Sequence, residues 1–303
     1  MVISLHDKVT IWDVKNSPFP YLVIKDILPR SLCDQLIAEY PKLEEIGVDH
    51  KANNKRWSYC AKDVAQNSQI TESWKQVIHY FSSDVFYHEL VNLLGDSVSA
   101  LYPKRFPDKK SLGNLRPGIR KVHDYNEKDI LLDAQICGNT PVTEAMSVRT
   151  NHVDSPLKLI SGLLYLRTDD DDSVGGDLEL RKFKSNYSQS KKTATYQGVY
   201  VDSSHTEICD VVNCEKNVLI LFVNSIESFH GVSPRLPTQH NRIFINIVVT
   251  VQKPLFGVPE PLGIKIRKSI QYQRGLFTLK KNKAVVWLKS LKWLRKIMGK
   301  SEL

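Results

Sequence analysis

The chain has 303 residues, of which 42% are hydrophobic and 25% are charged, as is ordinary for a soluble globular protein. It contains no apolar run near the roughly 18 residues that a spanning helix needs, and its first residues lack a basic region followed by an apolar stretch, so we expect neither a membrane span nor a signal peptide. The five cysteines include no C-x-x-C pair, so we expect reduced thiols, a cytoplasmic location and no zinc site.

The net charge of +9 comes from one end of the chain. Residues 261–300 hold 12 Lys and Arg and no acid, whereas the rest of the chain carries 30 basic and 33 acidic residues. This distribution argues against a nucleic-acid groove across the body of the protein, and we expect no nucleic-acid partner. An apolar stripe predicts a basic amphipathic helix over residues 280–300, which either contacts a membrane peripherally, at its inner face, or packs on the protein body.

The N-terminal half of the chain predicts helices that could support a sheet. Residues 1–30 favour strands, and residues 31–40 have the pattern of a short helix. Apolar side chains at helical spacing predict one long helix over residues 71–94, ended by Gly95. Residues 103–128 are rich in Pro, Gly, Lys and Arg, and we interpret them as a loop near the substrate site, a possible lid.

The second half of the chain predicts mostly strands, several of them apolar enough to be buried on both faces. They cover residues 131–137, 145–150, 158–166, 217–224 and 242–251. Four consecutive acids, Asp169 to Asp172, indicate a solvated turn. Gly175 and Gly176 then permit a tight return of the chain into another strand.

A histidine-x-aspartate motif and a later histidine supply the ligands of a metal site. His152 and Asp154 lie between two predicted strands, and His230 follows the predicted strand 217–224. Two imidazoles and one carboxylate form the ligand set of the facial triad that binds non-haem Fe(II). A His-x-acid motif alone is a weak signal, because the chain has a second one at His205 and Glu207. That second motif falls in a polar turn and is expected at the surface.

An arginine at the start of the last predicted strand is suited to binding a dicarboxylate. Arg242 could form a bidentate ion pair there, and burying it without an anion would be costly. Arg235 is the competing arginine, but it follows Pro234 in a loop and is expected to be solvated. Three further polar residues flank the predicted site and could contact a bound ligand: Arg149, Asn151 and Asn246.

An ordered set of motifs over roughly residues 120–252 resembles the core of the Fe(II)/2-oxoglutarate-dependent dioxygenases, prolyl-4-hydroxylase-like branch. The motifs are His152-Val-Asp154, Gly162-Leu-Leu-Tyr-Leu166, Gly175-Gly-Asp-Leu-Glu-Leu180, Phe229-His-Gly-Val-Ser-Pro234 and Arg242. The resemblance implies a mainly β fold with flanking helices and a double-stranded β-helix core, the cupin-like jelly roll. It divides the chain into a domain over residues 1–252, with helical support at about 31–95 and the core at about 120–252, and a basic extension over residues 253–303.

The resemblance also implies an oxidative enzyme with a defined set of cofactors. Fe(II) would be held by His152, Asp154 and His230, and the cosubstrate 2-oxoglutarate by Arg242 and Tyr165. O2 is the second cosubstrate, and ascorbate is an optional reductant. The chain departs from some relatives at Phe244, where they place a serine or threonine two residues after the arginine. The presence of Asp154 favours hydroxylation, desaturation or epimerisation over halogenation.

Three functions remain open at this point. The first is a hydroxylase of a small molecule or saccharide, lipid-linked if the tail binds a membrane, that releases succinate and CO2. The second is a prolyl or peptidyl hydroxylase that acts on a protein. The third is a non-catalytic protein that binds a membrane surface, against which the complete ligand set argues. An open groove at the mouth of the site would fit a peptide, and a closed, charged pocket would fit a sugar or an acid.

Overall fold

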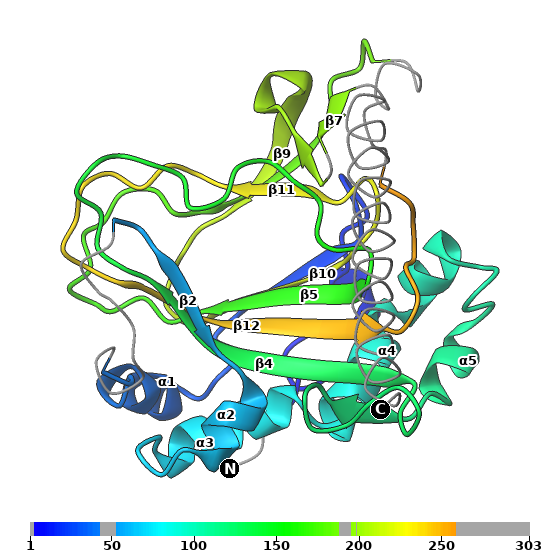
Figure 1. Ribbon diagram of the computed structural model, residues 1–303, viewed down its shortest axis with the longest axis horizontal. Coiled ribbons are helices and arrows are strands. Elements are labelled where there is room, and N and C mark those ends of the chain that lie inside the picture. The colour runs from blue at the N-terminus through cyan, green and yellow to red at the C-terminus, as the bar shows by residue number, and fades with distance from the viewer. Residues whose placement is uncertain (1–2, 43–52, 188–194, 198, 259–303) are drawn as a thin grey trace, which may run out of the picture.

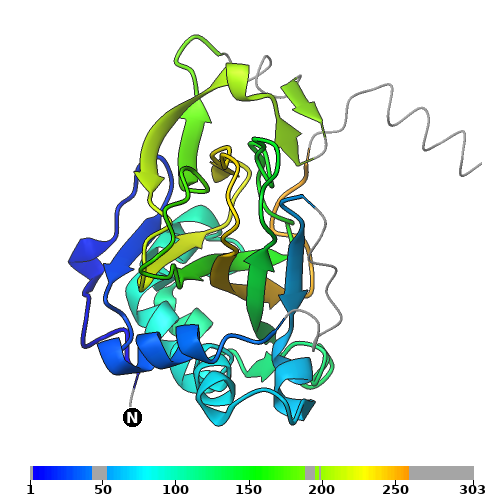
Figure 2. The ribbon, with the colours of Figure 1, turned by 90° about the vertical axis from the view of Figure 1, so that its left-hand side faces the viewer.

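The computed structural model describes residues 3–42, 53–187, 195–197 and 199–258. Two β-sheets face each other, and helices cover the outer face of the larger sheet (Figures 1 and 2). The predicted fold class, mainly β with flanking helices, is confirmed. The amphipathic helix predicted over residues 280–300 lies outside the described residues.

The strands form two principal sheets and one small hairpin. They are β1 (Tyr21–Lys25), β2 (Arg56–Tyr59), β3 (Pro117–Ile119), β4 (Ile130–Asn139), β5 (Lys158–Tyr165), β6 (Leu178–Phe183), β7 (Tyr196–Gln197), β8 (Tyr200–Val201), β9 (Thr206–Val212), β10 (Val218–Val223), β11 (Phe229–Val232) and β12 (Arg242–Val251). The larger sheet has the order β1-β10-β5-β12-β4-β2, with β3 parallel to β4. The smaller sheet has the order β11-β6-β9, and β7 pairs with β8.

The chain alternates between the two facing sheets, and this alternation defines the fold. It passes from β4 in the larger sheet to β5 through an irregular segment beside β11, then to β6 and β9 in the smaller sheet. It returns through β10, crosses to β11, and ends in β12, which pairs antiparallel with both β4 and β5. This is the double-stranded β-helix expected from the sequence.

The prediction of a regular strand over residues 145–150 is wrong, because this segment forms only isolated bridges. This segment runs beside β11 and the residues that follow it. One isolated bridge joins Met146 to Arg235, and another joins His152, just after the segment, to His230 of β11. The Ser147 hydroxyl donates to the Val232 carbonyl at 2.6 Å, so a side chain takes a position that a strand would give to a backbone N–H. The segment therefore pairs with the sheet without forming a continuous ladder.

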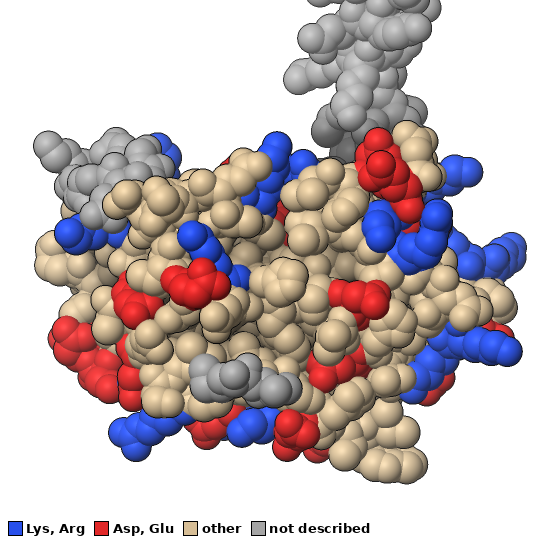
Figure 3. Space-filling model, turned by 90° about the horizontal axis from the view of Figure 1, so that it is seen from below, with Lys and Arg blue, Asp and Glu red and all other residues tan. Residues whose placement is uncertain are grey.

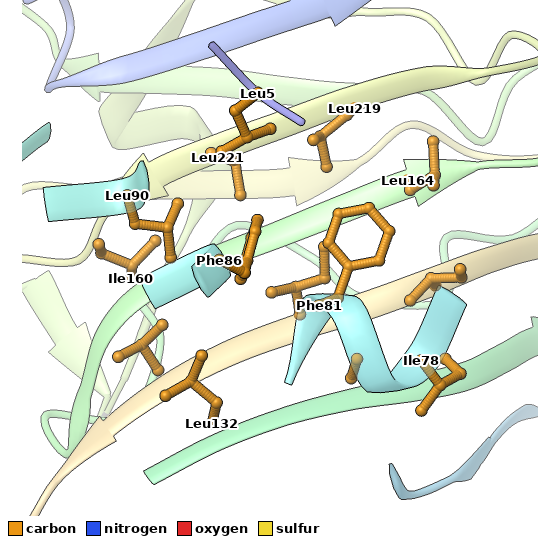
Figure 4. Close-up of a cluster of buried hydrophobic side chains, with 14 of the residues drawn as sticks. Leu5, Ile78, Phe81, Phe86, Leu90, Leu132, Ile160, Leu164, Leu219 and Leu221 are labelled. Carbon is orange, nitrogen blue, oxygen red and sulfur yellow. The ribbon is translucent and has the colours of Figure 1, made fainter. Parts of the chain in front are cut away.

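Helices pack on the outer face of the larger sheet and close the main hydrophobic core. They are α1 (Arg30–Ala38), α2 (Ala61–Gln66), α3 (Glu72–Phe81), α4 (Asp84–Leu101) and α5 (Lys109–Gly113), with 3-10 turns η1 (Ile11–Asp13) and η2 (Ser203–His205). Figure 4 shows Phe81 and Phe86 beside Leu164 and Leu219 of the sheet in one buried cluster. No helix in the described part of the chain has the length and apolar character to cross a bilayer.

The single helix predicted over residues 71–94 is wrong, because the chain breaks between α3 and α4. The Ser83 hydroxyl caps α4 by accepting from the Phe86 N–H at 3.2 Å. The neighbouring Ser82 hydroxyl accepts from the Ala134 N–H of β4 at 3.1 Å, which fixes the break against the sheet. The apolar spacing continues across the break, so hydrophobic periodicity alone could not reveal it.

Gly95 does not end a helix, and residues 103–128 are not a lid. α4 continues to Leu101, and a Cβ at Gly95 would lie 2.9 Å from the Lys109 side chain, so the glycine allows close packing of α5. Residues 103–128 include α5, which lies near α4 (Figure 1), and β3, which pairs with β4 in the larger sheet. None of them lines the cavity described below.

Candidate metal centre and cosubstrate pocket

Two of the predicted metal ligands are direct cross-strand neighbours. The His152 N–H donates to the His230 carbonyl at 2.9 Å, and the His230 N–H donates to the His152 carbonyl at 2.9 Å. This bridge places the two imidazole centroids 4.3 Å apart. Asp154 follows two residues after His152, just before β5, so its side chain reaches the same place from the side of the larger sheet.

The three side chains converge into one buried group. His152, Asp154 and His230 each offer one ligand atom, and these atoms all lie within 4.8 Å of one another. The His152 Nε2 lies 3.9 Å from Asp154 Oδ1, and the His230 Nε2 lies 4.0 Å from Asp154 Oδ2. The structure thus brings together all three residues that the sequence predicted as ligands.

The histidines are held in the form that a metal ion needs. Each Nδ1 lies near a main-chain carbonyl, Thr150 at 2.7 Å for His152 and Ser228 at 2.9 Å for His230, so Nδ1 carries the proton and Nε2 keeps its lone pair. Burial lowers the pKa of His152 to about 2 and also lowers the pKa of His230, so both imidazoles are neutral at pH 7. The buried His152 Nε2 has no hydrogen-bond partner among the described residues, and a divalent cation fits this donor set.

Asp154 is ionised and oriented by two residues that the sequence analysis missed. The Ser161 hydroxyl donates to Asp154 Oδ2 at 2.7 Å, and the Lys158 Nζ lies 3.0 Å from Oδ1. Burial acts to raise the pKa of Asp154, but the positive charge of Lys158 and the two nearby imidazoles outweigh it and lower the pKa. Lys158 could have been found as the basic residue four positions after the aspartate, whereas nothing in the sequence marks Ser161.

Arg242 is buried near the three candidate ligands, and its positive charge has no acidic partner among the described residues. It is 4% exposed, and its guanidinium lies 4.9–5.0 Å from the ring centroids of Tyr165 and Phe244. One terminal nitrogen donates to the Tyr165 hydroxyl at 3.2 Å and the other to Asn139 Oδ1 at 3.3 Å, while Nε has no partner. No acid of the described residues forms an ion pair with Arg242, so an anionic ligand fits this position.

Arg235 is not the solvated residue that the sequence suggested. It is 1% exposed and lies outside the cavity lining. Its guanidinium donates to the His240 carbonyl at 2.8 Å and to the Thr140 carbonyl at 3.2 Å. These acceptors are backbone atoms of distant or looped segments, so the burial of Arg235 is a tertiary effect. Its role is to hold loops together.

The Gly175-Gly176 turn packs closely against Arg235 and Arg242. The two residues have φ of +83° and +87°, in the region that favours glycine. A Cβ at Gly175 would lie 1.9 Å from the Pro234 carbonyl oxygen, and a Cβ at Gly176 would lie 3.0 Å from Arg235 and 3.3 Å from Arg242. The tight return predicted from the sequence is confirmed, and it closes directly over the arginine end of the pocket.

One cavity of about 580 Å³, including its part open to solvent, joins the metal ligands to Arg242. Its lining consists of Arg56, Asn139, Val148, Arg149, His152, Asp154, Lys158, Ser161, Gly162, Leu163, Leu178, Phe222, His230, Val232, Arg242, Phe244 and Asn246. Of the three flanking residues suggested by the sequence, Arg149 and Asn246 line the cavity. Asn151 does not; its amide donates to the Val201 carbonyl and the Thr206 hydroxyl, which is a structural role.

Two other groups of acids and histidines lie away from this cavity. Glu207 is exposed, and His205 contacts Tyr187, so the second His-x-acid motif forms no metal site within the described residues. Asp171, Asp172 and His240 come close enough to hold an ion, but Asp172 is exposed. This arrangement agrees with the solvated turn expected there.

No protein-family model matches the sequence, and no curated protein is found to match it. Solved structures with a similar fold include a prolyl 4-hydroxylase from Phytophthora capsici, at 18% identity and a TM-score of 0.44, covering 82% of this chain and 65% of that one. A prolyl-4-hydroxylase from Pseudomonas putida shares 14% identity, with a TM-score of 0.42 over 80% of this chain and 98% of that one. HygX from Streptomyces hygroscopicus, solved with nickel and 2-oxoglutarate bound, shares 11% identity, with a TM-score of 0.40 over 77% and 82%.

Proposed function

We propose that this protein is an Fe(II)- and 2-oxoglutarate-dependent dioxygenase that hydroxylates a C–H bond of a small molecule or saccharide. The observation that carries the proposal is the meeting of three buried ligand atoms, two from neutral imidazoles and one from a carboxylate, within 4.8 Å. Such a set leaves open coordination positions on Fe(II) for a bidentate cosubstrate and O2. The cavity beside it holds Arg242, a buried arginine suited to the far carboxylate of 2-oxoglutarate.

The residues around the site have separable tasks. Iron held by His152, Asp154 and His230, with 2-oxoglutarate and O2, would supply the oxidising chemistry, in which one oxygen atom of O2 would enter the C–H bond and the other succinate, with release of CO2. The carbonyls of Thr150 and Ser228 fix the two imidazoles, and Ser161 fixes the carboxylate. Arg242 and the Tyr165 hydroxyl, 3.2 Å apart, would bind the cosubstrate together. Apolar lining residues such as Leu163, Leu178 and Phe222 would limit the access of water to the reacting centre.

The alternative activities fit the cavity less well. A hydroxylase of proteins needs a mouth that accepts an extended peptide, whereas this cavity is lined by several charged side chains, among them Arg149, Lys158 and Arg242, as suits a small polar or acidic ligand. A binding protein without catalysis has no need for a complete, preorganised ligand set. Hydroxylation of a small molecule therefore has the strongest support, and a peptide substrate is the competing outcome of the test.

The test is a measurement of iron binding and of succinate release by the full-length protein. We expect one Fe(II) per chain and slow, O2-dependent conversion of 2-oxoglutarate to succinate, with ascorbate as reductant, which a metabolite screen should accelerate when the substrate is present. Asp154→Ala should abolish both, and Glu207→Ala, the acid of the second motif, should leave both unchanged. Equal succinate release by the two variants would refute the proposal, and acceleration by peptides alone would favour the protein hydroxylase.

A further inference from the structure

The cavity is unusually rich in positive charge. Among the described residues that line it, four are basic, namely Arg56, Arg149, Lys158 and Arg242, and Asp154 is the single acid. This excess is local, because residues outside 261–300 carry slightly more acids than bases. On the face seen in Figure 3, acidic and basic side chains are interspersed among uncharged ones. The positive charge of the cavity is therefore a feature of the binding site and not of a generally basic surface.

Two of these cations already have assigned partners. Arg242 is taken by 2-oxoglutarate under the proposed function, and the Lys158 Nζ lies 3.0 Å from Asp154 Oδ1. Because the two charges of Fe(II) and the two carboxylates of 2-oxoglutarate cancel, loading the site does not remove the positive excess. Arg56 and Arg149 therefore remain available to bind the primary substrate.

Arg56 and Arg149 approach the cavity from opposite sheets. Arg56 begins β2, is directly opposite Asn139 of β4, and its guanidinium lies 5.4 Å from the Phe244 ring centroid. Arg149 belongs to the segment beside β11, where its carbonyl accepts from the Val232 N–H at 2.9 Å. Its nearest acid atom, Asp154 Oδ1, is 3.7 Å away, beyond hydrogen-bond distance, and its side chain is 33% exposed. Both guanidinium groups thus keep donors available to a ligand.

We propose that the primary substrate is a small molecule bearing an oxyanion, and that Arg56 and Arg149 bind this anion so that a neighbouring C–H bond faces the metal. The proposal rests on the proposed function, since it takes the metal and cosubstrate positions from it. Guanidinium groups bind phosphate and carboxylate oxygens through paired hydrogen bonds, which gives orientation as well as affinity. The shared chemistry is the oxyanion, and either a phosphate or a carboxylate can supply it.

The experiment measures anion binding without turnover. Full-length protein is loaded with Ni(II) and 2-oxoglutarate, and the dissociation constants of inorganic phosphate, glycerol 3-phosphate, glycerate and glycerol are measured by calorimetry. We expect at least one anion to bind and glycerol not to bind. Arg56→Gln and Arg149→Gln should each weaken the anion on the order of tenfold, the value of one charge-assisted hydrogen bond. Arg149→Lys should recover part of the loss.

The control is Arg30→Gln, which removes the same charge from a side chain that is 93% exposed on α1. It should leave every anion affinity unchanged. A stronger effect of the variants on the phosphates than on glycerate identifies a phosphate substrate, and the reverse identifies a carboxylate. Anion affinities equal in the wild type and the Arg56→Gln/Arg149→Gln double variant would overturn the inference, as would tight binding of an acidic peptide alone.

The same samples separate this inference from the proposed function. If Ni(II) and 2-oxoglutarate bind normally but no anion distinguishes the variants, only the substrate inference fails. If His152→Ala binds Ni(II) as tightly as the wild type, the metal centre itself is misplaced. If Arg56→Gln or Arg149→Gln weakens 2-oxoglutarate as much as Arg242→Ala does, these arginines serve the cosubstrate and the inference is overturned.

Discussion

The two faces of the larger sheet have different roles: one packs in the hydrophobic core, and the other lines the cavity. On β12, alternate residues point to opposite sides. Ile243, Ile245, Ile247, Val249 and Val251 join the helix-covered core, whereas Arg242, Phe244 and Asn246 line the cavity. One face contributes burial of apolar surface, and the other positions polar groups for chemistry. Stability and activity should therefore respond to different substitutions on the same strands.

The two faces also differ in how polar their side chains are. The helix-covered side is mainly apolar, and Figure 4 shows part of its hydrophobic cluster. Two buried polar atoms there, Trp57 Nε1 and Ser99 Oγ, also lack a hydrogen-bond partner among the described residues. Around the cavity, three buried atoms have no hydrogen-bond partner among the described residues, namely His152 Nε2, Asn139 Nδ2 and Arg242 Nε. Buried polar atoms left unpaired cost free energy, and functional sites are where proteins tolerate that cost. Five experiments test this division.

The largest expected effect is on the cavity face. His152→Ala, Asp154→Ala and His230→Ala should each reduce iron-dependent succinate release by on the order of a hundredfold or more, because removing a ligand exceeds the loss seen for residues that merely orient ligands. In the metal-free protein, His152→Ala also removes the buried imidazole and its Nδ1 hydrogen bond to the Thr150 carbonyl, so the free energy of unfolding should fall by about 1–3 kcal/mol. Iron content, succinate release and urea denaturation measure these effects. Near wild-type turnover in any variant would refute the ligand assignment.

The helix-covered face should show the opposite pattern. Phe81→Ala removes a fully buried ring that packs on Phe86 at a centroid distance of 5.1 Å, and should lower the free energy of unfolding by about 3–5 kcal/mol. Iron and 2-oxoglutarate affinities of the folded protein should not change. Val85→Ala, at an exposed position of α4, is the control and should shift unfolding by less than about 0.5 kcal/mol. A loss of metal affinity in Phe81→Ala would show that the faces are coupled.

The two buried arginines allow a matched test of the pocket's far end. Arg242→Ala should weaken 2-oxoglutarate binding by roughly 2–5 kcal/mol, because a buried charge-assisted pair is lost. Arg235→Ala should leave that affinity unchanged and lower the free energy of unfolding by about 1–3 kcal/mol, since it strands the carbonyls of Thr140 and His240. Titration with 2-oxoglutarate and urea denaturation measure the two effects. The reverse pattern would mean that Arg235 binds the cosubstrate.

The neutral histidines predict how the stability of the metal-free protein depends on pH. Burial lowers the pKa of His152 from 6.5 to about 2. Below pH 6.5 this histidine is therefore protonated in the unfolded chain but stays neutral in the folded chain. Stability should therefore fall as pH decreases from 6.5, by roughly 1.4 kcal/mol per pH unit at full effect. His230 adds to this in the same direction, because burial lowers its pKa too. Denaturation at several pH values should give a shallower slope for His152→Ala, and identical slopes would contradict the neutral state.

The smallest expected effect concerns the phenol that contacts Arg242. Tyr165→Phe removes one hydroxyl and keeps the buried ring, so 2-oxoglutarate affinity should fall by roughly 1 kcal/mol, or about fivefold. Folding should be unaffected, because the ring still packs beside Phe244. A calorimetric titration resolves a change of this size. An unchanged affinity would leave Tyr165 as a core aromatic residue only.

Several strands could be predicted from the sequence because local patterns encode them, and so could the convergence of His152, Asp154 and His230. The strand predicted over residues 242–251 coincides with β12, and those over 158–166 and 217–224 agree with β5 and β10 within one residue at either end. Their short lengths and their β-branched, apolar composition favour strands over buried helices. The His152-x-Asp154 spacing alone is a weak signal, and its position between two predicted strands is what distinguished it from His205-x-Glu207.

The remaining features depend on contacts between distant segments. Arg56 reaches the cavity only because β2 pairs with β4, 80 residues later along the chain, and nothing near Arg56 indicates that pairing. Arg235 was expected in solvent because its sequence neighbours are loop-like, whereas backbone carbonyls of other segments bury it. The serine pair between α3 and α4 breaks a helix whose apolar spacing continues unchanged. Tertiary partners, and not propensities, decide each of these cases.

The backbone pairing of His152 with His230 makes the metal centre a reporter of strand register. Successive side chains of a strand point to opposite faces, so a slip of one residue between these segments would turn one imidazole away from Asp154. A chain with misaligned strands could then bind no iron, while a bound ion would tie together two segments 78 residues apart and oppose their separation. Amide hydrogens of His152 and His230 should accordingly exchange with deuterium more slowly once metal is present.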